Sequence, residues 1–596
     1  MPRRIVCAVF ALASLGIVAC GSDDHPSAGR MKARLASVFD VADKDPTPDE
    51  LRVALARQLR ANPLPEAGAT PSKDAPFPSR EAIEGFYAKQ GDRMVWTDAG
   101  GKALPVTVSL VAALKNAGEH GLVPDDYAVD RIESLTKEIG EKGGDERAAS
   151  RLADFDLLAT TAFFRYASDL STGRVHPDEV EKDWHTNPPE LDLVTALDAA
   201  ITSGDLAKLL ASLPPPHPGY ERLRAGLAKL TAIDAAGGWP TIPEGPKIGP
   251  SARGPRVAAL RLRLQEPAVG ANAPAEMPAP SDRFDKALGA DVKTFQELHG
   301  LEPSGVVDHA TLTALNVPVK DRIRQVELNL ERWRWIPRNL GETHVLVNIP
   351  GFDLELDKGE STAWRTRVIT GKAFTPTPVF SDRIVAVVVN PPWNVPESIA
   401  VNEFLPELRK NSKAMEKHGM RILKGSEEKP DEVDPAKVDW AKVDPEHFPY
   451  RFRQDPGSEN PLGRIKFDLT NGYHVYLHDT PGGHVFGRSE RDVSHGCIRV
   501  QNAVELADQI TTTPTREKIH EALEQPDERR IDLDAKIPVH ILYWTAWADE
   551  HGNLHYGPDV YEFDPPQRAA LDKAGQRGAT ETSPVTRSGE KTPPGA

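Results

Sequence analysis

Ser494-His495-Gly496-Cys497-Ile498-Arg499-Val500 is the stretch that decides the fold and chemistry of this chain, together with Tyr473-His474-Val475-Tyr476-Leu477-His478-Asp479. The residues Tyr473 to Leu477 are aromatic or β-branched and alternate in polarity, which predicts a strand with His478 at its end. In an extended backbone every second side chain lies on one face. We therefore expect His495, Cys497 and Arg499 to share a face.

This constellation points to nucleophilic catalysis by a cysteine. A free thiol has a pKa of about 8.5, so a nucleophilic cysteine needs a neighbouring base to form thiolate. His478 and His495 are the two available bases. Gly496 lets backbone approach closely and leaves N–H groups free for the oxyanion of a tetrahedral intermediate.

The chain has only three cysteines in 596 residues, which excludes a disulfide-rich scaffold and a Cys-rich zinc protein. Each cysteine therefore needs its own explanation. Residues 1–19 combine a basic start, Arg3 and Arg4, with an uncharged run from Ile5 to Ala19. That run is too short for a comfortable transmembrane helix and is typical of a signal peptide. It ends in Ile17-Val18-Ala19-Cys20-Gly21.

This ending resembles the lipobox of bacterial lipoproteins, whose cysteine is lipidated and becomes the first mature residue. The resemblance implies a lipid anchor on Cys20 and a periplasmic location. Because Gly21 and not Asp follows, it also implies sorting to the inner leaflet of the outer membrane. An ordinary secretory signal with an incidental Cys20 stays open. With lipidation and loss of Cys7, Cys497 remains as the one free thiol, a liability in an oxidising compartment unless it is buried or used.

Composition narrows the function classes further. The chain has 72 Lys and Arg against 88 Asp and Glu, a net charge of −16. A general nucleic-acid binder needs a basic footprint, so nucleic acid is excluded as a partner. The oligomeric state cannot be read from these numbers.

The first half of the chain predicts mainly helices. We expect a tether and linker over residues 20–77 and a helical scaffold domain over 78–240, where apolar residues such as Leu110 and Leu114 recur at helical spacing. Residues 250–318 predict a small three-helix module with the elements Phe295-Gln296, His299-Gly300-Leu301 and Gly305 to Asp308. Asp308 is placed to cap the last helix. This pattern resembles the peptidoglycan-binding module, and a plain helical spacer is the alternative.

The second half changes to short β-branched runs bounded by Gly or Pro, over residues 345–349, 352–356, 365–370, 384–390, 464–469, 473–477 and 539–544. These runs predict a mainly β sandwich or barrel-like domain over 340–546, and so a multidomain α+β protein. An insertion over 398–460 is expected to be a lid, a binding loop or disordered. Residues 565–596 are polar and rich in Pro and Gly, which predicts a disordered tail.

The motif His-x15-Ser-His-Gly-Cys-hydrophobic-Arg resembles the signature of the L,D-transpeptidases, bacterial enzymes that cross-link peptidoglycan. The surrounding residues 390–396, 453–457, 460–463 and 477–481 are similar to the large branch of that family, which has a helical scaffold, a peptidoglycan-binding module and a lid-bearing catalytic domain. One departure is His495, where much of this branch is expected to carry Ser, so the role of His495 stays open.

The resemblance implies roles for individual residues. Cys497 matches the nucleophile and His478 the base, oriented by the backbone carbonyl of Asp479. Arg499 matches a position that holds substrate, with a structural ion pair as the alternative. Tyr476 and Trp393 are expected to wall the pocket, and core packing remains an equal alternative for both.

The implied reaction is acyl transfer from a tetrapeptide stem through a thioester to an acceptor amine, giving a 3→3 cross-link and releasing D-Ala. It needs no metal or organic cofactor. An L,D-carboxypeptidase with the same site, or a lipid-anchored peptidoglycan-binding protein without catalysis, remains possible. A metallopeptidase is disfavoured, because His474 and His478 have a zinc spacing only on a helix.

Overall fold

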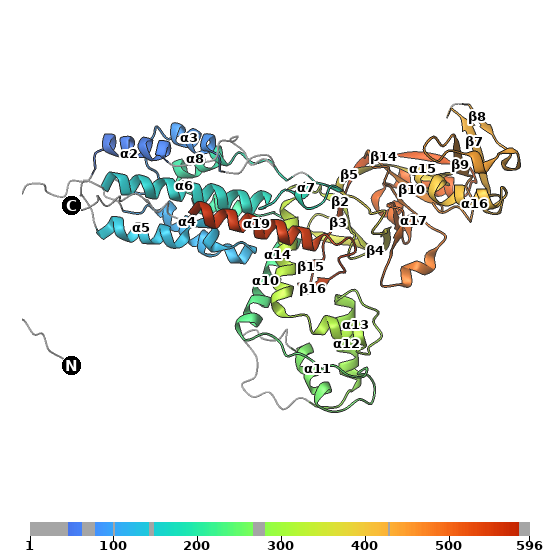
Figure 1. The fold of residues 1–596 in the computed structure, drawn as a ribbon, viewed down its shortest axis with the longest axis horizontal. Coiled ribbons are helices and arrows are strands. Elements are labelled where there is room, and N and C mark those ends of the chain that lie inside the picture. The colour runs from blue at the N-terminus through green and yellow to red at the C-terminus, as the bar shows by residue number, and fades with distance from the viewer. Residues whose placement is uncertain are drawn as a thin grey trace, which may run out of the picture.

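The computed structural model describes residues 46–61, 78–98, 102–141, 148–186, 188–265, 281–426 and 429–582. The expected signal peptide, Cys20 and most of the linker lie outside them. Within this part, no helix is long and apolar enough to cross a membrane. Helices fill one end of the molecule and strands the other (Figure 1), which confirms the predicted multidomain α+β class.

The scaffold is built around α6 (Ala148–Thr172), whose buried residues include Phe155, Phe163 and Phe164. Aromatic side chains of this size bury enough apolar surface to hold several helices against one long one. The helices packed in this region are α2 (Pro48–Ala61), α3 (Arg80–Lys89), α4 (Pro105–Lys115), α5 (Val129–Glu141), α8 (Leu193–Ser203) and α9 (Leu206–Ser212). Helix α10 (Pro218–Ala235) packs against α14 (Val319–Arg334) in a neighbouring apolar cluster.

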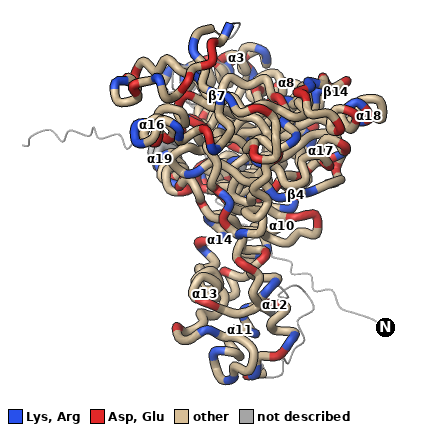
Figure 2. The backbone as a smooth tube through the Cα atoms, turned by 90° about the vertical axis from the view of Figure 1, so that its right-hand side faces the viewer, with Lys and Arg blue, Asp and Glu red and all other residues tan. Residues whose placement is uncertain are grey.

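A three-helix module forms a separate lobe that projects from the other domains (Figure 2). It consists of α11 (Pro255–Gln265), α12 (Lys286–Leu298) and α13 (His309–Leu315) around a separate apolar core. Asp308 accepts a hydrogen bond from the Thr311 N–H at 2.9 Å, so the predicted cap of α13 is confirmed. Helix α14 (Val319–Arg334) then leads into the β domain.

The β domain is a sheet that closes on itself. Neighbouring strands run in the order β5 (Val379–Val389), β10 (Ile465–Leu469), β11 (Leu477–His478), β13 (Ile498–Val500), β4 (Ser361–Gly371), β3 (Asp353–Lys358), β2 (Thr343–Asn348) and β14 (Arg529–Leu542). Strand β14 pairs with β2 on one side and with β5 on the other, which completes the ring. Inward side chains such as Val347, Val387 and Ile541 form the main core.

Two segments from outside the sheet attach to this domain. Strand β1 (Trp184–His185) of the scaffold pairs in parallel with the start of β5. The insertion after β5 is an ordered subdomain with its own apolar core and a sheet in the order β6 (Trp393–Asn394), β9 (Tyr450–Gln454), β7 (Met420–Gly425) and β8 (Pro430–Glu432).

The C-terminal tail corrects one prediction. The sequence predicts a disordered tail over residues 565–596, whereas α19 (Asp564–Thr582) is helical and lies along the scaffold (Figure 1). Proline is tolerated in a first helical turn, so Pro565 and Pro566 start the helix instead of preventing it. The buried side chains of Leu571 and Gln567 then hold α19 against the rest of the protein. The polar composition of the tail does not indicate these tertiary contacts.

Candidate active site

The predicted base His478 is the last residue of β11, and the predicted nucleophile Cys497 directly precedes the parallel strand β13. Leu477 of β11 is paired with Ile498 of β13, and His478 with Arg499. Leu477 and Ile498 both point into the main core. Because side chains alternate along a strand, His478 and Arg499 point to the opposite face of the sheet. The Ile498 N–H donates to the Tyr476 carbonyl at 3.1 Å, which sets Cys497 beside Tyr476.

Lys466 extends this arrangement into a row of nitrogen-bearing side chains. It is paired with His478 across β10 and β11, so Lys466, His478 and Arg499 lie side by side on three neighbouring strands. The Lys466 ammonium contacts Asp468 at 2.8 Å and lies 5.0 Å from the centre of the Tyr476 ring. Such a row favours negatively charged ligand groups.

His478 is held as a neutral base. Its Nδ1 donates to the Asp479 carbonyl at 2.5 Å, the contact expected from the resemblance, which leaves Nε2 to accept a proton. The side chain is buried, with 4% exposed. This burial, together with the positive charges of Arg499 and Lys466, lowers the pKa of His478 to about 3.

Cys497 is half-buried, with its Sγ 3.8 Å from the His474 carbonyl. Burial raises the pKa of the thiol above its ordinary value. Hydrogen bonds from the Tyr476 backbone and hydroxyl oppose this shift, as do the charges of Arg499 and Lys466. The resting pair is therefore a thiol and a neutral imidazole, and the thiolate forms when its proton moves to a base.

The nucleophile loop, residues 494–497, bends where an extended backbone was expected. Gly496 has φ +107°, a conformation that favours glycine, so the prediction that His495 shares a face with Cys497 and Arg499 is wrong. The Gly496 N–H donates to the Ser494 hydroxyl at 3.1 Å, and that hydroxyl donates to the Cys497 carbonyl at 2.6 Å. Among the described residues the Cys497 N–H has no partner, so it is free to donate a hydrogen bond to an oxyanion.

His495 and Trp393 connect with the insertion. The His495 Nε2 lies 2.5 Å from a carboxylate oxygen of Glu403, which belongs to the one-turn segment Ala400–Phe404. Trp393 packs against the insertion's apolar core, with its ring edge-to-face to Phe404 at 6.2 Å. The core-packing alternative therefore describes Trp393 in this structure. Tyr476 stays at the site, with its ring 5.7 Å from the His478 imidazole.

Arg499 is the polar group of the site that the fold leaves unpaired. Among the described residues it has no hydrogen bond or ion pair, and its Nε is buried without a partner. Burial lowers the pKa of Arg499, although a guanidinium stays charged at neutral pH. The structural ion pair considered from the sequence is absent from this part of the chain, which leaves Arg499 available to a ligand carboxylate.

Sequence reasoning did not identify Lys466, Ser494 or Glu403 as parts of the site. Lys466 had one usable signal, since it alternates with the apolar Ile465 and Phe467 in a predicted strand. That signal places Lys466 on the outer face but does not say which strand lies next to it. No three of the described His, Cys, Asp and Glu side chains are grouped to hold a metal.

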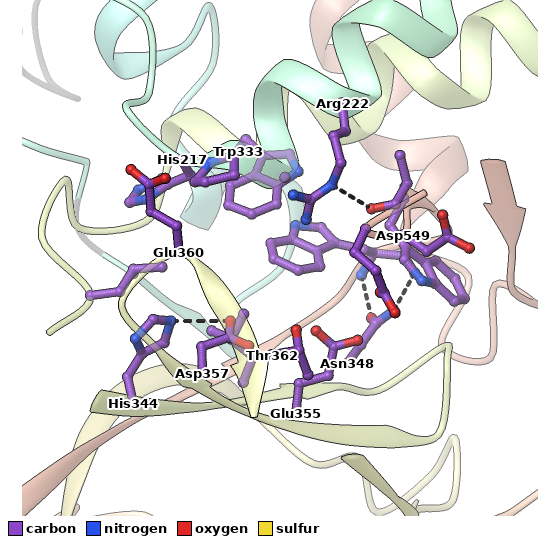
Figure 3. A pocket seen from close by; sticks show the side chains of 18 of the residues that line it. His217, Arg222, Trp333, His344, Asn348, Glu355, Asp357, Glu360, Thr362 and Asp549 are labelled. Atoms are coloured by element: carbon purple, nitrogen blue, oxygen red, sulfur yellow. Dashed lines mark hydrogen bonds and ion pairs between the residues drawn. The ribbon is translucent and has the colours of Figure 1, made fainter. Parts of the chain in front are cut away.

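A separate cavity of about 260 Å³ lies where α10 and α14 meet β2, β3 and β4, and its lining includes Trp333, Asp357 and Arg222. Figure 3 shows these side chains converging from the scaffold and from the sheet. Several polar groups of this cavity are paired with each other, as in the 3.5 Å contact between His344 Nε2 and a carboxylate oxygen of Asp357. Cys497 and His478 are not part of its lining.

Three domain families match the chain. They are described as "Scaffold domain" over residues 81–227, "Putative peptidoglycan binding domain" over 253–315 and "L,D-transpeptidase catalytic domain" over 342–521. A Haemophilus influenzae protein described as "Putative L,D-transpeptidase" is 34% identical over 247 residues, which are 40% of this chain and 48% of that protein. The match thus spans about half the length of this relative.

Solved structures of similar proteins share little sequence with this chain. An L,D-transpeptidase from Stackebrandtia nassauensis is 16% identical, with 51% of this chain and 96% of that chain covered and a TM-score of 0.20. An L,D-transpeptidase from Xylanimonas cellulosilytica is also 16% identical, with 50% of this chain and 99% of that chain covered and a TM-score of 0.17. The three matches and the curated relative show that the chain carries an L,D-transpeptidase catalytic domain over residues 342–521, preceded by a scaffold domain and a domain similar to peptidoglycan-binding domains.

Proposed function

We propose that this protein cross-links peptidoglycan stems by cysteine acyl transfer, forming 3→3 bonds. The match of residues 342–521 to an L,D-transpeptidase catalytic domain and the curated relative support this proposal. The observation that carries the finer proposal is the geometry around Cys497. The neutral imidazole of His478 is buried on the strand beside the one that Cys497 precedes, the Cys497 N–H has no partner among the described residues, and the guanidinium of Arg499 is unpaired.

The first half-reaction forms a thioester. The Cys497 thiol gives its proton to Nε2 of His478, and Sγ bonds to the carbonyl carbon between stem residue three and D-Ala. The negative oxygen of the tetrahedral intermediate accepts a hydrogen bond from the Cys497 N–H, a contribution of about 3 kcal/mol per donor in comparable sites. The C–N bond then breaks, and imidazolium returns the proton to the departing amine of D-Ala.

The second half-reaction uses the same groups in reverse. The acceptor amine attacks the thioester carbonyl and loses a proton to His478, and the sulfur leaves as thiolate and regains that proton. The His478–Asp479 hydrogen bond keeps the imidazole in one tautomer through both steps.

Arg499 and Lys466 bind the donor stem through its terminal carboxylate. The unpaired guanidinium of Arg499 can accept a carboxylate in a two-bond geometry. Lys466 adds a second positive charge on the next strand but one. Since D-Ala carries that carboxylate away, these contacts favour a tetrapeptide donor.

The insertion favours amine over water as the acceptor. Its Glu403 contacts His495 in the nucleophile loop, so the subdomain lies directly over one side of the site. A cover at this place excludes bulk water from the thioester. This supports a transpeptidase over an L,D-carboxypeptidase with the same nucleophile.

We further propose that the mature chain is a periplasmic lipoprotein anchored through Cys20, facing the peptidoglycan from the inner leaflet of the outer membrane. The support is the sequence Ile17-Val18-Ala19-Cys20-Gly21 behind an uncharged run. Replacement of Cys20 by Ala should abolish incorporation of labelled fatty acid and release the protein into the soluble periplasmic fraction. Unchanged labelling would contradict the anchor.

The cross-linking proposal is tested by product analysis. The chain from residue 21 onward is incubated with disaccharide-tetrapeptide, and the products are separated and weighed by mass spectrometry. We expect 3→3 dimers and one D-Ala released per dimer, and neither with Cys497→Ala. Release of D-Ala with tripeptide monomers alone would make the protein a carboxypeptidase. A folded chain without any turnover would support the non-catalytic wall-binding protein.

A further inference from the structure

The segment that follows the matched catalytic domain returns to the nucleophile loop. Tyr561 lies beyond residue 521, where the family match ends, and its hydroxyl is buried beside the turn that joins β4 to β5. This hydroxyl donates to the Gly371 carbonyl at 2.8 Å and accepts from the Thr377 N–H at 3.1 Å. Tyr561 therefore bridges both ends of that turn.

Thr377 connects this turn with the nucleophile loop by hydrogen bonds. Its hydroxyl accepts from the Gly371 N–H at 2.9 Å and donates to the Gly496 carbonyl at 2.8 Å. The side chain is 1% exposed, so these bonds do not compete with solvent. The turn is tight, because a Cβ on Gly371 would collide with the Thr375 carbonyl oxygen and the Thr377 nitrogen.

The direction of the oxyanion donor follows from these bonds. The carbonyl of Gly496 and the N–H of Cys497 belong to one planar trans peptide unit and point in opposite directions. Holding the Gly496 carbonyl against Thr377 therefore aims the Cys497 N–H away from Thr377. That N–H has no hydrogen-bond partner among the described residues.

The far end of the segment is fixed at the domain junction. The Tyr561 N–H donates to the Tyr543 hydroxyl at 2.8 Å, and that hydroxyl donates to Asp559 at 2.6 Å. Asp559 accepts from the backbone N–H of Asp564, the first residue of α19. Asp564 in turn pairs with Arg332 of α14 at 2.6 Å. A continuous series of hydrogen bonds and one ion pair therefore connects α14, through the C-terminal segment, with the nucleophile loop.

We propose that Tyr561 is a positioning residue for transition-state stabilisation, acting through Thr377 on the peptide unit that carries the Cys497 N–H. This inference rests on the proposed acyl-transfer function. It assigns a part of the active site to the C-terminal segment, outside the matched catalytic domain. A tyrosine that only fills the core would affect stability and leave the chemistry of Cys497 unchanged.

The test compares two reactions of the same thiol. A carbapenem acylates Cys497 through a tetrahedral oxyanion, whereas iodoacetamide alkylates it at a saturated carbon without one. Tyr561→Phe removes the hydroxyl and keeps the ring. Because the donor is misaligned and not deleted, we expect acylation to slow by about 10-fold, less than the 10²–10³ for loss of a donor, and alkylation to stay within about twofold.

Matched variants separate positioning from stability. Thr377→Val should slow acylation at least as much as Tyr561→Phe, and Thr377→Ser, which keeps a hydroxyl, should restore it. Tyr127→Phe is the control, since it removes a buried hydroxyl that donates to Asp169 at 3.0 Å in the scaffold. It should lower the melting temperature by a few degrees, as expected for loss of one buried hydrogen bond, and leave both rates unchanged.

Two results would overturn the inference while the proposed function stands. In the first, the wild type is acylated and Tyr561→Phe is acylated at the same rate. In the second, Tyr561→Phe loses acylation and alkylation to the same extent. A wild-type thiol that is alkylated but never acylated would instead overturn the proposed function, and this inference with it.

Discussion

Two arginines, one at the domain junction and one at the nucleophile, show how differently this molecule treats buried charge. Arg332 on α14 is 1% exposed, and all three of its nitrogens donate: Nε to Gln567 at 2.8 Å, Nη1 to Thr545 at 3.2 Å and Nη2 to Asp564 at 2.6 Å. Arg499 on β13 is half-buried and makes no such bond among the described residues.

The difference separates a structural charge from a functional one. A buried charge without hydrogen bonds costs free energy, so a fold pairs its charges unless something else is to bind them. The satisfied network of Arg332 joins α14 to the C-terminal segment. The unpaired Arg499, beside the neutral His478 and the free Cys497 N–H, is arranged for a substrate that brings the missing acceptors.

The largest effect is expected on the functional side of this comparison. His478→Gln keeps a polar side chain of similar size but removes the base. Carbapenem acylation should slow by about 10³-fold, within the range known for loss of a general base, while the melting temperature changes little. Acylation is followed by intact mass spectrometry in a time course. A variant with a tenth of the wild-type rate would remove His478 from the mechanism.

On the structural side, Arg332→Leu leaves Asp564 without its cation. We expect a loss of about 3 kcal/mol in the free energy of unfolding, measured by urea denaturation, because breaking a buried ion pair strands the remaining charge. The double variant Arg332→Leu with Asp564→Asn should recover part of that loss. Equal destabilisation by both would show that the charge of Asp564 is not the cause.

Arg499→Met reverses the pattern expected for Arg332. It should leave the free energy of unfolding unchanged or slightly higher, since no bond within the described fold is lost. Turnover of disaccharide-tetrapeptide should fall by about 30-fold, the value of one charge-assisted hydrogen bond of about 2 kcal/mol. Arg421→Met, which breaks an exposed pair with Glu432 on the insertion, is the matched control and should change neither quantity measurably.

The pH dependence of stability gives the smallest effect. The pKa of His478 is lowered to about 3, whereas an unfolded histidine titrates near 6.5. The unfolded state alone binds this proton between those values, so stability from His478 is complete above pH 6.5 and is lost as the pH falls towards 3. Relative to His478→Gln, the wild type should lose at most about 2 kcal/mol between pH 7 and pH 5. A pH-independent difference would contradict the buried neutral imidazole.

The sequence predicts the local residues of this site better than the residues that reach it from other parts of the chain. Cys497, His478 and Arg499 lie in two short stretches, and the pairing of β11 with β13 sets His478 beside Arg499, two residues after Cys497. The prediction for the nucleophile loop, residues 494–497, is wrong. Alternation of side chains between two faces assumes an extended backbone, whereas Gly496 has a positive φ. Predicted strands agree with β2, β3, β4, β5, β10 and the end of β14, since their β-branched residues are also their core residues.

Contacts across long sequence separations could not be predicted. Lys466 reaches the row only through the pairing of β10 with β11, and Glu403 only through the folding of the insertion. Thr377 and Tyr561 have no local pattern that distinguishes them from other buried polar residues. The helix α19 forms because its few apolar and polar contacts fit the scaffold, a tertiary effect that composition does not contain.

The central claim is that Cys497 becomes acylated by a stem peptide, and intact mass spectrometry of the chain mixed with disaccharide-tetrapeptide tests it most directly. We predict an increase equal to the substrate mass less D-Ala, confined by peptide mapping to Cys497 and absent from Cys497→Ala. A folded wild-type chain that gains no mass, or that gains it equally in Cys497→Ala, would contradict the account.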